Sequence, residues 1–206
     1  MANKKKEKMD KLVLFLLPIG VAINFVGGQI AANLGLPVYL DVIGTVAVGA
    51  LCGAFPGAIV GLVSNLINTV TYPLNICYAP VSIIIGILSA ILSKRGFFKK
   101  PLKIALVIIV FGLIGGGLSA VITWIVYGFD FGMPPSSYIS VPLYKVFHLN
   151  KFICEFIGSS CIDTFDKIIS VIVVVGVLRA IPQRMLAKLP LGDNYVKEEN
   201  DEEEDF

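Results

Sequence analysis

Residues 151–179 read KFICEFIGSSCIDTFDKIISVIVVVGVLR, an apolar stretch that nevertheless carries several ionisable side chains. A helix over these 29 residues is about 43 Å long at about 1.5 Å per residue, which is more than the hydrocarbon core of a bilayer requires. The second half, Ile168 to Leu178, contains no charge, whereas the first half contains Glu155, Asp163, Asp166 and Lys167. The stretch predicts a helix with a polar first half and an apolar second half.

Helical periodicity places the polar side chains of this stretch on one face. At about 100° per residue, five of them fall within an arc of about 80°: Glu155, Ser159, Asp163, Asp166 and Ser170. A charge at the centre of a bilayer costs about 2.5–3.5 kcal/mol, so this face should line an aqueous cavity or contact a partner. The alternative is an internal ion pair, such as Asp163 with Lys167 one helical turn away. We interpret the face as one side of a binding cavity.

The composition is that of a membrane protein. Hydrophobic residues make up 56% of the chain, charged residues only 16%, and the mean hydropathy is +0.83. No charged residue lies between Lys11 and Asp41 or between Asp41 and Lys94. The chain has no GxxxxGK[ST], HExxH or GxSxG motif, and its four cysteines have no CxxC spacing. We therefore expect neither catalysis nor a metal site nor a cofactor, and nothing indicates nucleic-acid binding.

Six apolar segments predict an all-α integral membrane bundle of six transmembrane helices. They are residues 12–32, 42–54, 57–70, 78–92, 102–127 and 151–179. Phe55-Pro56 separates the second from the third, and each of these two is short for a full span of about 20 residues. If residues 42–70 formed one kinked span instead, the basic loop at 94–103 would lie outside the cell. The positive-inside rule therefore favours two short helices.

The basic residues set the predicted orientation. Fourteen of the 17 lie at the amino terminus, in the loop at 94–103 or after residue 178. We therefore expect a multi-pass protein of the cell membrane with both termini in the cytoplasm, its first apolar segment being a retained helix rather than a cleaved signal. Residues 191–206 contain eight acidic residues and predict a disordered cytoplasmic tail after a transmembrane domain over residues 1–190.

Three connections are predicted outside, and they carry candidate ligand-binding side chains. Asp41 could cap the following helix or contact a ligand. Residues 128–150 could form a lid, a re-entrant segment or a disordered link, and their aromatic side chains could anchor at the lipid interface or cover a ligand. Trp124 is either an interface residue or a stacking platform. The candidate substrate-binding residues are Asn65, Asn68, Tyr78, Trp124, Glu155, Ser159, Asp163 and Asp166. This mixture favours a compact, ring-bearing ligand that donates hydrogen bonds or carries positive charge.

Two stretches give the chain a resemblance to a known family: VYLDVIGTVAVGALCGAFPGAIVGLVSNLI at 38–67 and DTFDKIISVIVVVGVLRAIPQR at 163–184. On the basis of these patterns, the chain resembles the S components of energy-coupling factor (ECF) transporters over roughly residues 10–190. The resemblance implies a six-helix bundle that captures a vitamin-like micronutrient outside the cell. It also implies two kinds of partner, a transmembrane coupling subunit and a pair of cytoplasmic ATPases, with rotation of the bundle delivering the ligand. The family's site, built from outer loops and the outer halves of later helices, matches the candidate residues above.

Two other functions remain open at this point. The chain could be a membrane sensor or assembly module that binds a ligand or partner without transport. It could also be a complete secondary transporter, although its small size and the absence of an evident inverted repeat of discontinuous helices make this less favourable.

Overall fold

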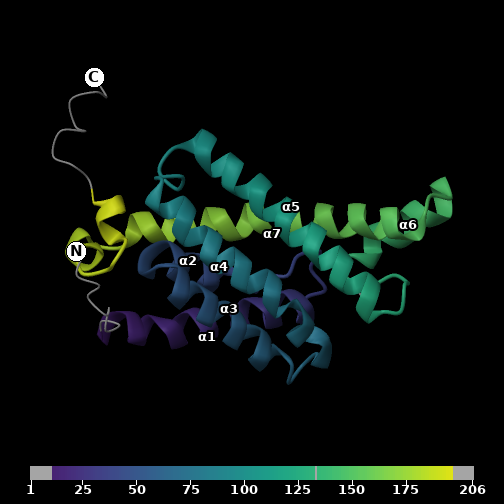
Figure 1. Ribbon diagram of the computed structural model, residues 1–206, viewed down its shortest axis with the longest axis horizontal. Coiled ribbons are helices and arrows are strands. Elements are labelled where there is room, and N and C mark those ends of the chain that lie inside the picture. Colours follow the sequence, from purple (N-terminus) through teal and green to yellow (C-terminus); the bar gives the residue numbers. More distant parts are fainter. Residues whose placement is uncertain (1–10, 133, 197–206) are drawn as a thin grey trace, which may run out of the picture.

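The computed structural model describes residues 11–132 and 134–196, and all regular structure within them is helical (Figure 1). The prediction of an all-α fold is thereby confirmed. The α-helices are α1 (Lys11–Asn33), α2 (Ile43–Cys52), α3 (Ala54–Asn68), α4 (Ala79–Lys94), α5 (Pro101–Val126), α6 (Ser137–Phe147), α7 (Lys151–Ala180) and α8 (Gln183–Leu186). Two 3-10 helices complete the set, η1 (Pro73–Tyr78) before α4 and η2 (Gly192–Tyr195) after α8.

The bundle exposes apolar side chains and buries ionisable ones, the reverse of a soluble domain. Three helical segments are long and apolar enough to cross a membrane: Lys11–Asn33, Pro73–Lys94 and Pro101–Val126. On α5, Leu113 is 58% exposed and Ile125 64%, whereas Lys167 inside the bundle is 2% exposed. Large exposed apolar surfaces mark contact with lipid or with a partner. The fold therefore agrees with a membrane protein.

The break between α2 and α3 lies at Gly53, so the prediction that Phe55-Pro56 separates these helices is wrong. Gly53 has a φ of +109°, a backbone conformation that glycine adopts without steric cost. Pro56 belongs to the first turn of α3. Proline is tolerated there because the backbone N–H that it lacks would have no partner within the helix.

Glycines let neighbouring helices approach closely. A Cβ atom on Gly57 of α3 would lie 2.7 Å from the Cα of Gly49 in α2 and 2.8 Å from the carbonyl oxygen of Gly86 in α4. On α5, a Cβ on Gly112 would lie 2.6 Å from Thr164 Oγ1 of α7, and one on Gly116 would collide with the backbone at Ser160. These contacts show the close helix packing that small residues permit.

The helices give the bundle two ends with different chemistry. The start of α1, the α4–α5 connection and the segment after α7 lie together at one end, which we call the basic end because Lys94, Arg95, Lys99 and Lys100 are there (Figure 1). The connections 34–42, 69–78 and 127–150 lie toward the opposite end, which we call the cavity end for the feature described below (Figure 1).

Of the three possibilities left open for residues 128–150, the structure argues against a disordered link, and it also shows order in the first part of the predicted disordered tail. Residues 128–150 contain α6, and Ser140 of α6 packs against α7, where a Cβ on Gly158 would lie 3.0 Å from the Ser140 Cβ. Residues 191–196 pack at the basic end, where Leu191 N–H donates to the Leu51 carbonyl at 2.9 Å and the Tyr195 hydroxyl lies 2.7 Å from Ser93 Oγ. The predicted tail boundary at 191 is therefore too early, because these contacts order the chain to residue 196. Residues 197–206 of that tail lie outside the described residues.

Candidate functional site

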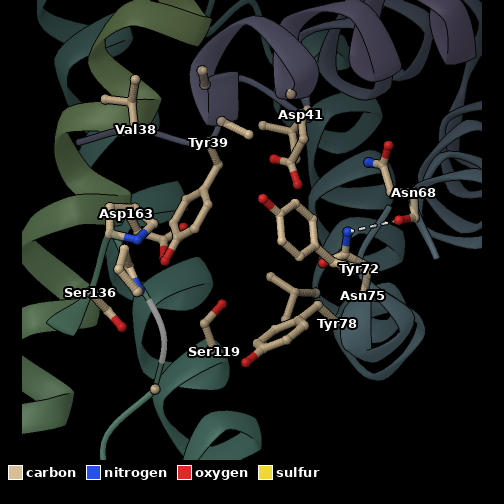
Figure 2. A pocket seen from close by; sticks show the side chains of 18 of the residues that line it. Val38, Tyr39, Asp41, Asn68, Tyr72, Asn75, Tyr78, Ser119, Ser136 and Asp163 are labelled. Carbon is tan, nitrogen blue, oxygen red and sulfur yellow. Dashed lines mark hydrogen bonds between the residues drawn. The ribbon is translucent and has the colours of Figure 1, made fainter. Parts of the chain in front are cut away.

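A cavity of about 460 Å³ opens among α1, α3, α4, α5 and α7 at the cavity end, beneath the connections that join these helices. Figure 2 shows Tyr39 and Asp163 on one side of it, Asn68, Tyr72 and Asn75 on the other, and Asp41 between them. Its polar and aromatic lining consists of Gln29, Tyr39, Asp41, Asn65, Asn68, Tyr72, Asn75, Tyr78, Ser82, Ser119, Thr123, Tyr127, Ser136, Tyr138, Asp163 and Lys167. Aromatic rings with a few converging polar groups are the usual lining of a small-molecule site.

A group of four ionisable residues, Asp41, Asp163, Asp166 and Lys167, joins α7 to the loop before α2; we call it the carboxylate–lysine cluster. Lys167 Nζ donates to Asp163 Oδ1 at 3.1 Å and to Asp166 Oδ2 at 2.6 Å. The other oxygen of Asp166, Oδ1, accepts the backbone N–H groups of Tyr39 at 3.0 Å and Leu40 at 2.7 Å. Asp166 therefore holds the loop against α7, and it does not line the cavity.

The remaining carboxylates of the cluster, Asp163 and Asp41, are less completely paired than Asp166. Asp163 is 3% exposed, and its Oδ2 atom has no hydrogen-bond partner. Asp41 forms no salt bridge with any lysine or arginine of residues 11–132 and 134–196. Burial in its loop, reinforced by the negative charge of Asp166, raises the pKa of the Asp41 carboxyl to about 6. With one ammonium for three carboxylates, the cluster has a formal charge of −2 when all are ionised.

Asp41 does not cap α2. The N-cap of that helix is Val42, and no side chain accepts a hydrogen bond from its first turn. Of the two roles that the sequence left open for Asp41, the structure excludes capping and places the residue at the cavity.

Amide and tyrosine side chains form the side of the cavity opposite α7. Asn65 is anchored, since its Nδ2 donates to the Gly61 carbonyl at 2.9 Å and to Ser82 Oγ at 2.7 Å. Asn68 is 6% exposed, and its Oδ1 atom has no partner. The Tyr78 hydroxyl lies 2.8 Å from Thr123 Oγ1, which fixes that ring against α5. Asn68 Oδ1 and Asp163 Oδ2 are thus buried oxygens without a hydrogen-bond partner on two residues that line the cavity, an uncommon state for buried polar atoms.

Glu155 belongs to a second buried polar group, behind the cavity lining. The carboxylate is 0% exposed, and its Oε1 atom accepts hydrogen bonds from Ser136 Oγ and Ser159 Oγ, each at 3.0 Å. Ser136 lines the cavity, but Glu155 and Ser159 do not. Ser136, the residue before α6, lines the cavity and hydrogen bonds to Glu155, so this carboxylate supports the lining through Ser136.

Trp124 also lies outside the cavity lining, in an aromatic group with Phe129 and Phe152. Its ring centroid is 6.0 Å from that of Phe129 and 5.4 Å from that of Phe152, both in edge-on arrangements. Edge-to-face pairs of this kind stabilise the packing of α5 on α7. A stacking role for Trp124 in the cavity is therefore not supported.

Four of the eight sequence-predicted site residues come together at the cavity: Asn65, Asn68, Tyr78 and Asp163. The other four, Trp124, Glu155, Ser159 and Asp166, lie behind or beside it, because helical periodicity gives the direction of a side chain but not which segment covers it. Sequence reasoning missed Tyr39, Ser119, Thr123 and Ser136, which also line it. The only available signal for Tyr39 was its closeness in sequence to Asp41.

The site as described can bind a small molecule through hydrogen bonds, charge and ring packing. No family model matches the chain, and neither a curated protein nor a solved structure matches it.

Proposed function

We propose that this chain is the substrate-binding membrane subunit of an ECF-type importer. In this proposal it captures a vitamin-like small molecule at the cavity end and delivers it inward with a coupling subunit and two ATPases. The observation that carries the proposal is the cavity itself, whose lining includes Asp163 and Asn68, each with a buried oxygen that has no hydrogen-bond partner. The resemblance at 38–67 and 163–184 supports the same function.

A six-span arrangement underlies the proposal. The three long apolar segments would be joined by α7 and by the short helices α2 and α3. The 30 residues of α7 are long enough to span. Between its two ends all four charged side chains, those of Glu155, Asp163, Asp166 and Lys167, are buried, whereas the apolar Phe165 and Ile172 are exposed. The basic end would face the cytoplasm, and the cavity end would face outward.

The cavity lies at one end of the bundle, and apolar side chains fill the interior elsewhere. Val46, Val60, Ile85, Phe111 and Val174 are each 0% exposed and belong to one apolar core. A side-chain core at normal packing density leaves no path for a solute. Capture at one side with delivery by movement of the whole bundle fits this arrangement better than a channel does.

Thiol labelling tests the orientation. In a background without the four native cysteines, Lys100→Cys at the basic end and Val146→Cys on α6 both replace exposed residues. An impermeant reagent should modify residue 146 in intact cells and residue 100 only after lysis. Labelling of both positions in intact cells would overturn the six-span arrangement.

Uptake tests the partnership. Cells that express this chain with a coupling subunit and its ATPases should accumulate the ligand, and ATPase-inactive variants should abolish accumulation while binding persists. Ion-driven uptake by vesicles that contain this chain alone would instead show a secondary transporter. Binding without uptake under any partner combination would favour a sensor.

A further inference from the structure

The charges around the cavity are not balanced. Glu155 lies behind the Ser136 side of the cavity, and like Asp41 it forms no salt bridge with a basic residue in the described parts of the chain. The carboxylate–lysine cluster adds three carboxylates and one ammonium. Four carboxylates therefore surround or back the cavity against a single lysine, a formal charge of −3 when all are ionised.

Lys167 has little capacity left to attract an anionic ligand. Two carboxylates already accept its hydrogen bonds, and the ammonium is 2% exposed. Asp166 is likewise saturated, by Lys167 and by two backbone N–H groups. The other charged residues of the cavity lining are Asp41, which forms no salt bridge within the described residues, and Asp163, whose buried Oδ2 atom has no hydrogen-bond partner. An uncompensated carboxylate out of water is costly, and a cationic ligand would remove that cost.

Three tyrosine rings surround the same space. Figure 2 shows the rings of Tyr39 and Tyr72 on opposite sides of the cavity, and Tyr78 also belongs to its lining. The faces of aromatic rings attract cations, and their edges and faces pack against flat ligands. The rings and the carboxylates thus favour the same class of ligand, one that combines positive charge with a ring.

We propose that the cavity selects a small organic cation bearing a flat ring, whose charged group contacts Asp41 and Asp163 and whose ring packs among Tyr39, Tyr72 and Tyr78. The inference rests on the proposed function and names the substrate class of the same site. The carboxylates expected to contact the charged group of the ligand are those of Asp41, in the loop before α2, and Asp163. Glu155 and Asp166 do not line the cavity.

Three ring compounds of nearly equal shape test the charge requirement: benzamidine (cationic), benzamide (neutral) and benzoate (anionic). Calorimetric titration of the purified full-length chain at millimolar probe concentrations should show benzamidine binding about tenfold more tightly than benzamide, with benzoate weakest, because charge-assisted hydrogen bonds are about twice as strong as neutral ones. Asp41→Asn should reduce the preference for benzamidine. Asp130→Asn, which removes an exposed carboxylate paired with Lys151, should keep it.

A variant that narrows the cavity locates the binding. Gly28 lines the cavity, and a Cβ there would lie 3.6 Å from the Asp41 Cβ and 4.0 Å from Asn68 Nδ2, so Gly28→Val should abolish benzamidine binding. Gly176→Val is the matched control, because a Cβ at Gly176 has no neighbour within 4 Å.

The outcomes separate the two proposals. If benzamide or benzoate binds as tightly as benzamidine or more tightly, and Gly28→Val abolishes that binding, the cation inference is overturned. The cavity would still be a binding site for small molecules, as the proposed function requires. Benzamidine binding that survives Gly28→Val, or no binding of any probe, would also overturn the inference, and the uptake experiment would still decide the proposed function.

Discussion

Two buried polar groups in this molecule differ in how completely they are hydrogen bonded. In the first, Asn24 of α1 donates to Thr45 Oγ1 at 2.8 Å and to Ser64 Oγ at 2.9 Å, and its Oδ1 accepts the Gly44 N–H at 2.7 Å. This Asn24 group joins α1, α2 and α3, and Asn24 is 0% exposed. The second is the carboxylate–lysine cluster, which retains an unpaired oxygen on Asp163 and borders the cavity.

The difference separates a structural role from a binding role. In the Asn24 group, both Nδ2 and Oδ1 of the amide are used within the protein, so the group specifies how three helices meet. The carboxylate–lysine cluster fixes its Lys167 and Asp166 in the same way, but its Asp41 and Asp163 line the cavity, and Asp163 Oδ2 has no hydrogen-bond partner. We therefore expect changes in the first group to alter stability alone and changes in the second to alter binding as well.

The largest effect is expected for Lys167→Met. The substitution keeps an unbranched side chain but leaves Asp163 and Asp166 buried without their cation. Breaking a buried ion pair in this way costs about 3–5 kcal/mol in the free energy of unfolding, which thermal unfolding of the purified protein would measure. The matched variant Lys151→Met breaks the exposed pair with Asp130, and its unfolding temperature should scarcely change. Similar losses in both variants would contradict the role given to the cluster.

Asp163→Asn should weaken binding by about 1.5–3 kcal/mol, roughly ten- to hundredfold, because a charge-assisted hydrogen bond to the ligand is lost. Glu155→Gln should leave affinity close to that of the unchanged protein, since Glu155 is held by Ser136 and Ser159 behind the lining. Benzamidine titration of both variants makes the comparison. If Glu155→Gln lost more affinity than Asp163→Asn, the residue that recognises the ligand would be Glu155, which does not line the cavity.

Asn24→Ala should destabilise the fold by about 1–2 kcal/mol, the range for hydrogen bonds between membrane helices. Affinity for benzamidine should persist because Asn24 does not line the cavity. Asn33→Ala on the same helix is the control, as its side chain makes one exposed hydrogen bond to the Gln29 carbonyl. A binding defect in Asn24→Ala at unchanged stability would abolish the distinction between the two polar groups.

The smallest effect is expected from pH. The pKa of the Asp41 carboxyl is raised to about 6 in the folded protein. Between about pH 4 and pH 6 the folded protein therefore keeps a proton on Asp41 that the unfolded chain has lost, and the free energy of unfolding should fall slightly as the pH rises through this range. Affinity for a cation should change in the opposite sense and rise by up to about tenfold between about pH 5 and pH 7 as Asp41 ionises.

The charged groups around Asp41 are Asp163, Asp166 and Lys167, and Asp41→Asn tests whether Asp41 itself is responsible. Titrations at several pH values should lose their slope in that variant. An unchanged slope would assign the titration to another group.

Part of the site could be predicted from the sequence because α7 is a regular helix. Its polar face at 155–170 followed from a period of 3.6 residues, and Asp163 indeed reaches the cavity. The same period could not show that Ser136 hydrogen bonds to Glu155, nor that the backbone at Tyr39 and Leu40 occupies Asp166. The contacts of Asp166 join residues more than 120 positions apart and that of Ser136 with Glu155 spans 19, and no local pattern encodes either.

The sequence by itself determined the helical class, the apolar character of the segments and the small residues at their contacts, since these follow from local periodicity and hydropathy. It also placed the break between the second and third segments within three residues, although propensity alone could not choose Gly53 over Phe55-Pro56. Only the tertiary structure decided which polar side chains face a cavity and which face one another. The physical reason is that burial and hydrogen-bond satisfaction depend on neighbours from distant parts of the chain, and Asp41, in a loop without periodicity, acquires its place only when α7 packs against that loop.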